Sequence, residues 1–124
     1  MEKRIKNIEH GKVLALAEEV TYQPGQIASK TLAQNKCHSL TLFAFDKGEE
    51  ISAHQSAGDA FALALDGVGR VTIDGEEFAL HAGEAIVMPA GIPHAVYAVE
   101  RFKMLLTVIF PSADEKGASR ENGK

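Results

Sequence analysis

Histidine side chains are the groups in this chain best suited to chemistry near neutral pH, because imidazole can transfer a proton, bind a metal ion or hydrogen-bond a ligand. His94 follows a Pro-Ala-Gly corner at residues 89–91 and opens an apolar segment, and His54 lies just before another turn-rich stretch. A lone histidine at the start of an apolar strand is most simply a hydrogen-bonded core residue. A functional site requires that the fold bring a second polar group to it.

The adjacent pair Cys37 and His38 is a second candidate, because a thiol beside an imidazole is a potential nucleophile. Successive residues of a strand point to opposite faces, so we expect this pair to be structural. The same alternation places Tyr97 opposite to His94, on the outer face or at a subunit contact. His81 lies in a turn and is expected to be solvated. The two histidines above therefore remain the main candidates.

Short strands separated by turn residues must position these side chains. Asp66-Gly67 and Asp74-Gly75 each predict a hairpin turn, because a type I′ turn needs positive φ at both central residues. Strands are expected at residues 26–34, 39–45, 51–56, 60–65, 68–73, 78–80, 85–88, 94–98 and 102–110. No helix-length periodic segment separates them, which predicts an antiparallel sandwich or barrel.

The length of 124 residues indicates one domain, with the core at about residues 12–110. Residues 1–11 are polar and charged and are expected to form a loosely held N-terminal arm. Residues 111–124 have the small, polar, mixed-charge composition of a disordered tail.

Composition excludes several classes of partner. The formal net charge is −4 and the Lys and Arg residues are scattered, so neither nucleic acid nor a membrane is expected as a partner. The N-terminus has no apolar signal-peptide core. Cys37 is the single cysteine, which suits a reducing compartment, and we expect a cytoplasmic protein.

The spacing of histidines, glycines and prolines resembles the two signature motifs of the cupin superfamily, G-x5-H-x-H-x3-E-x6-G and G-x5-P-x-G-x2-H-x3-N. The matching residues are Gly48, His54 and Gly67 in the first motif and Gly83, Pro89, Gly91 and His94 in the second. The intervening segment, Val68 to Ala82, has the short length typical of small microbial cupins. The resemblance implies an all-β, antiparallel double-stranded β-helix, or jelly-roll, barrel.

The resemblance to metal-binding cupins is partial. In those proteins the first motif supplies two histidines and a glutamate or third histidine, and the second motif supplies one histidine. His54 and His94 match, but Ser56, Ala60 and Ala98 stand where a histidine, an acidic residue and an asparagine are expected. Two imidazoles are fewer than the three protein ligands of a catalytic zinc or a non-haem iron. The resemblance therefore implies at most a weak site for Zn, Ni, Fe, Mn or Cu.

Small side chains accompany the missing ligands. If Ala60 faces the barrel interior, alternation places Ala62 and Ala64 there too, which favours a roomy apolar pocket. Asp59 could replace the missing acid only if a β-bulge shifted the strand. The predicted ligand pocket comprises His54, Ser56, Ala60, Ala62 and His94.

These observations favour a module that binds a small molecule, with a weakly held divalent metal as a further occupant. The alternative is a metal-dependent enzyme of the dioxygenase, isomerase or decarboxylase type, which would need an unrecognised third ligand. Metal-free acid–base catalysis, as in cupin-like nucleotide-sugar epimerases, lacks an adjacent carboxylate. No catalytic residue is assigned. A homodimer is expected, with the exposed segment 26–34 at the contact.

Overall fold

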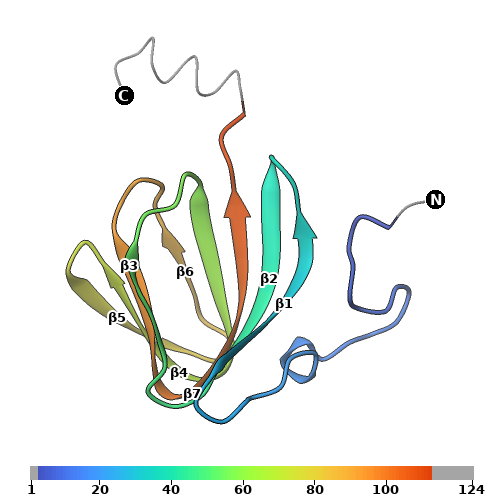
Figure 1. Ribbon diagram of the computed structural model, residues 1–124, viewed down its shortest axis with the longest axis horizontal. Helices are drawn as coiled ribbons and strands as arrows, with labels where there is room; N and C mark the ends of the chain where they lie inside the picture. Colours follow the sequence, from blue (N-terminus) through green and yellow to red (C-terminus); the bar gives the residue numbers. More distant parts are fainter. Residues whose placement is uncertain (1–2, 113–124) are drawn as a thin grey trace.

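The computed structural model describes residues 3–112 and forms one antiparallel all-β unit, as predicted (Figure 1). The strands are β1 (Ile27–Gln34), β2 (His38–Phe45), β3 (Glu50–His54), β4 (Asp59–Ile73), β5 (Glu76–His81), β6 (Ala85–Met88) and β7 (His94–Ile109). A single-turn 3-10 helix, η1, spans Leu16–Glu18. Most of the predicted tail, residues 113–124, lies outside the described residues. No helix within residues 3–112 is long and apolar enough to cross a membrane.

Two long strands organise the barrel. The strand order is β1-β2-β7-β4-β5, with β3 also paired to β7 and β6 also paired to β4. The first part of β7 pairs with β3, and its second part pairs with β2. β4 is divided in the same way between β6 and β5. Figure 1 shows the strands curving around a common interior.

The predicted hairpin at Asp66-Gly67 is wrong, because these residues lie inside the continuous strand β4. The ladder between β4 and β7 has register shifts on both sides of Gly67, so the segment is a bulged bend. Gly67 has φ +77°, and a Cβ at this position would lie 1.5 Å from Arg101 O. Glycine is therefore required by close approach to β7 rather than by a chain reversal. Likewise, the two predicted strands at residues 94–98 and 102–110 are one strand, β7.

The second predicted turn is confirmed. Asp74 and Gly75 have φ values of +50° and +85°, and Ile73 pairs with Glu76 across the turn. The turn therefore connects β4 directly to β5, with both central residues in the conformation that favours Asp-Gly.

The barrel interior is a packed apolar core. Its largest members are Phe45, Phe102, Met88 and Met104, none more than 1% exposed, and the small buried side chains of β4 belong to the same cluster. Met88 and Met104 thus fill the interior together with the two phenylalanines and the small side chains of β4.

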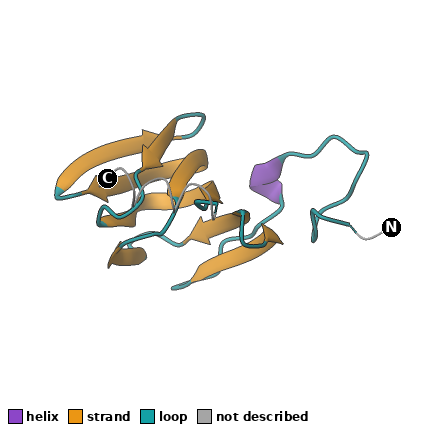
Figure 2. Ribbon diagram, turned by 90° about the horizontal axis from the view of Figure 1, so that it is seen from above, coloured by secondary structure: helices purple, strands orange, loops and turns teal. Residues whose placement is uncertain are grey.

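A second apolar cluster lies where the N-terminal segment meets the sheet. Leu32, Leu42 and Ala44 are buried there together with Val20 from the segment after η1, and Ile8 packs against them. Figure 2 shows this N-terminal segment beside the barrel. The arm is more firmly held than its polar composition suggests.

Hydrogen bonds attach the arm, and the segment that follows it, to the sheet. Lys6 N donates to Leu32 O at 2.7 Å, and Asn7 Nδ2 donates to Thr31 O at 2.7 Å. Further along the segment, the Tyr22 hydroxyl donates to the Asp66 carboxylate on β4. The arm is therefore tied to β1, and the segment that follows it is tied to β4.

Candidate functional site

The corner at residues 89–93, between β6 and β7, donates hydrogen bonds to the loop after β3 and to the first residue of β4. Gly91 N donates to Ser56 O at 2.9 Å, and Ala90 N donates to Asp59 Oδ1 at 2.9 Å. The Asp59 carboxylate thus orders the corner, which is a different role from the ligand role considered for it. These bonds set the point at which β7 begins.

The structure brings His54 and His94 together. They are cross-strand partners at the end of β3 and the start of β7, after an irregularity in β3 beyond Ile51. Their ring centroids are 4.4 Å apart in an edge-to-face arrangement, with the planes at 66°. His94 is 4% exposed, whereas His54 is exposed. The pair therefore joins one buried and one accessible imidazole.

Backbone carbonyls orient both rings. Nδ1 of His54 lies 3.0 Å from Ser52 O, and Nδ1 of His94 lies 3.3 Å from Ile92 O. Because a carbonyl oxygen can only accept, Nδ1–H is the donor in each contact, and in a neutral ring Nε2 carries the lone pair. Histidines that bind metals or ligands are commonly oriented in this way.

The environment of His94 favours its neutral form. Burial and the neighbouring His54 hold the pKa of His94 below its ordinary value, and the contact with Ile92 O opposes this in part. At neutral pH, His94 therefore presents a lone pair rather than a positive charge.

The donor set fits a tightly held metal ion poorly. Within residues 3–112, no group of three or more His, Cys, Asp or Glu side chains gathers in a way that could hold a metal. The pair supplies two nitrogen donors, below the three protein ligands usual for a catalytic zinc or non-haem iron. What the arrangement offers is two oriented hydrogen-bond acceptors on an apolar barrel.

The other residues of the predicted pocket, Ser56, Ala60 and Ala62, are half-buried or buried. The Ser56 hydroxyl accepts a hydrogen bond from Gly58 N at 3.2 Å, and Ser56 is half-buried. Ala60 and Ala62 are 1% and 0% exposed within the packed core. A ligand reaches these alanines only if neighbouring core side chains move.

The remaining candidates from the sequence are surface groups. Tyr97 lies under the Arg70 guanidinium, 4.6 Å from ring centroid to Cζ. His81 is exposed, and its Nδ1 lies 3.0 Å from Glu84 Oε1. Cys37 is an exposed free thiol in the turn before β2.

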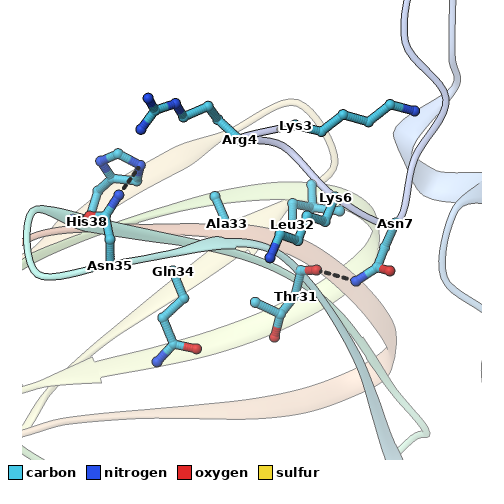
Figure 3. A pocket seen from close by; sticks show the side chains of 10 residues that line it. All are labelled: Lys3, Arg4, Lys6, Asn7, Thr31, Leu32, Ala33, Gln34, Asn35 and His38. Atoms are coloured by element: carbon cyan, nitrogen blue, oxygen red, sulfur yellow. Dashed lines mark hydrogen bonds between the residues drawn. The ribbon is translucent and has the colours of Figure 1, made fainter. Parts of the chain in front are cut away.

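A feature that sequence reasoning missed is a cavity of about 580 Å³ between the N-terminal arm and the β1–β2 hairpin (Figure 3). Three cations of the arm, Lys3, Arg4 and Lys6, line it. The sequence shows these three cations close together near the N-terminus, but the facing surface on β1 forms only in the folded protein.

The class defined by this fold is a small antiparallel barrel in which two histidines meet at the paired ends of β3 and β7. Residues 41–110, more than half of the chain, match the model of the family described as the cupin domain. The chain belongs to the cupin family. No curated protein matches it.

Solved structures agree with this assignment. A conserved protein of unknown function from Streptococcus pyogenes is 50% identical, with a TM-score of 0.88 over 90% of this chain and 98% of that one. A cupin superfamily protein from Desulfitobacterium hafniense is 31% identical, with a TM-score of 0.83 over 87% and 99%. A cupin 2 conserved barrel domain protein from Leptotrichia buccalis is 45% identical, with a TM-score of 0.74 over 75% of this chain and 45% of that one.

Proposed function

We propose that this cupin binds a small organic molecule at His54 and His94. The observation that carries the proposal is the orientation of both rings, in which each Nδ1 faces a backbone carbonyl and each Nε2 lone pair is left for a ligand. The lowered pKa of His94 keeps that nitrogen an acceptor at neutral pH. Such a site suits a ligand with hydroxyl or N–H donors and an apolar body.

A divalent metal at this position would be weakly held. Two imidazole nitrogens leave most of the coordination sphere of Zn, Ni, Fe, Mn or Cu to water or to donor atoms of the ligand itself. A metal-dependent enzyme would need a third protein ligand, and none joins the pair within residues 3–112. We therefore propose small-molecule binding, rather than metal-dependent catalysis, as the function of the histidine pair.

The proposal is tested by native mass spectrometry of full-length protein purified without a tag. The expected result is an organic species retained by the wild type and lost in both His54→Ala and His94→Ala. His81→Ala is the matched control, because it removes an exposed imidazole outside the pair. Retention of the same species by both pair variants would refute binding at this position.

We further propose a cytoplasmic homodimer that pairs through β1. Support comes from the position of β1 at the end of the strand order and from the free thiol of Cys37, which suits a reducing compartment. Light scattering coupled to size-exclusion chromatography measures the mass directly. A monomer across the accessible concentration range would exclude the dimer.

A further inference from the structure

The cavity between the N-terminal arm and the β1–β2 hairpin is a separate concave surface from the histidine pair. Its volume of about 580 Å³ falls within the range of small-molecule sites. Its lining comes from the arm, from the second half of β1 and from the start of β2, and neither His54 nor His94 belongs to it. Figure 3 shows the arm residues on one side and the hairpin residues on the other.

The lining is strongly positive in a protein that is negative overall. Lys3, Arg4 and Lys6 contribute three cations, and none of the described residues that line the cavity is acidic. The formal net charge of the whole chain is −4. None of the ion pairs within residues 3–112 includes these three cations. The positive charge of the cavity is therefore not neutralised by described side chains.

The arm that carries these cations is attached to β1 by two hydrogen bonds. Lys6 N donates to Leu32 O, and Asn7 Nδ2 donates to Thr31 O. These bonds fix the arm, which forms one wall of the cavity, against β1, which belongs to the other wall. These bonds use the backbone of Lys6 and leave its ammonium group for a ligand. The cavity is thus partly organised before any ligand arrives, which lowers the entropic cost of binding.

The opposite wall adds oriented polar groups. Asn35 Oδ1 accepts from the backbone N–H groups of Cys37 and His38, at 2.8 and 3.0 Å. This fixes the orientation of the amide, so Asn35 Nδ2 is the donor toward His38 Nε2 at 3.4 Å. His38 then carries its proton on Nδ1, a second donor on this wall.

We propose that this cavity binds a compact oxyanion with two or more negative charges, of the phosphate-ester or polycarboxylate class. A guanidinium binds such groups through paired hydrogen bonds, and the two ammonium groups add charge without demanding one geometry. The site stands independently of any ligand at the histidine pair. It requires that a dimer formed through β1 leave residues 31–34 open to the ligand.

The test is calorimetric titration of the untagged full-length chain with pyrophosphate and, separately, with citrate. The cavity variant carries Lys3→Gln, Arg4→Gln and Lys6→Gln. The matched control carries Lys12→Gln, Lys47→Gln and Arg70→Gln, which changes the net charge equally but removes cations that are ion-paired elsewhere. Circular dichroism confirms that both variants fold.

The expected result is binding of at least one probe that weakens by about tenfold or more in the cavity variant and by less than about twofold in the control. Binding should also weaken as salt is added. Preference for pyrophosphate or for citrate identifies the phosphate or the carboxylate class. Binding of neither probe to the wild type, or equal losses in both variants, would overturn the proposal.

Discussion

At the scale of single residues, the main result is the contrast between two neighbouring histidines. His94 is buried and held neutral, whereas His54 is exposed at the end of its strand. In both rings Nδ1 faces a backbone carbonyl, so Nε2 is the nitrogen that carries the lone pair when the ring is neutral. The sequence motif predicted that these two residues share a site, but it gave no information on the exposure or tautomer of either.

The lowered pKa of His94 predicts a pH dependence of stability. Between the pKa values of the unfolded and folded states, the unfolded chain binds the proton more readily, so the free energy of unfolding rises with pH. The contribution of neutral His94 to the free energy of unfolding should be complete above about pH 6.5. It should be lost as the pH falls through the lower pKa that His94 has in the folded state. Urea unfolding from pH 5 to 8 in the presence of EDTA measures it.

The control for this pH dependence is the comparison of two variants. In His94→Gln, the slope of unfolding free energy against pH should become shallower in this window. Gln23→Ala, which removes an exposed side chain that does not titrate, should keep the wild-type slope. An unchanged slope in His94→Gln would mean that this residue does not titrate differently in the folded and unfolded states.

At the scale of the elements, β4 shows why local turn signals have limits. Asp-Gly occurs at residues 66–67 and at 74–75, but only the second is a chain reversal. At Gly67 the pairing with β7 continues on both sides, and the tertiary contact decides the outcome. The alternation of strands and turn residues predicted an antiparallel sandwich or barrel, and the motif resemblance specified the barrel. Whether residues 66–67 form a bulge or a turn depends on the neighbouring strand β7.

Gly67→Ala should destabilise the protein by about 3 kcal/mol or more, because the new Cβ would meet Arg101 O and the backbone has positive φ. Gly75→Ala is the matched control, with φ +85° but open space around the site, and should cost only about 1–2 kcal/mol. Chemical denaturation measures both. Equal costs would show that backbone conformation alone, and not the close approach, requires glycine at residue 67.

The N-terminal segment and β1 should be necessary for a soluble barrel. Removing residues 1–34 takes away Val20 and Leu32 and exposes the buried side chains of Leu42 and Ala44 on β2. We expect the truncated chain to be recovered mainly as aggregate, as measured by the soluble fraction after expression. A soluble, folded monomer would contradict this expectation.

At the scale of the whole molecule, the chain is a cupin barrel that has two of the histidines of the metal-binding cupin motifs but lacks the other ligands. A separate cavity lies between the N-terminal arm and the β1–β2 hairpin. The histidine pair was found from the sequence because its positions follow the spacing of a family motif. The arm cavity was not found, because Lys3 and Arg4 approach residues 31–38 only through the folding of the segment between them. The packing of Ala60 and Ala62 also depends on core side chains that spacing does not specify.

The ligand site that we propose at His54 and His94 has too few donors to hold a metal ion tightly. The most direct test is the zinc content and zinc affinity of untagged protein after dialysis, compared with His54→Ala, His94→Ala and His81→Ala. We expect no stoichiometric zinc after dialysis. Added zinc should bind with a dissociation constant weaker than about 1 μM, and this binding should be lost in either pair variant but kept in His81→Ala. Stoichiometric zinc that survives dialysis in the wild type and disappears with either histidine of the pair would contradict it.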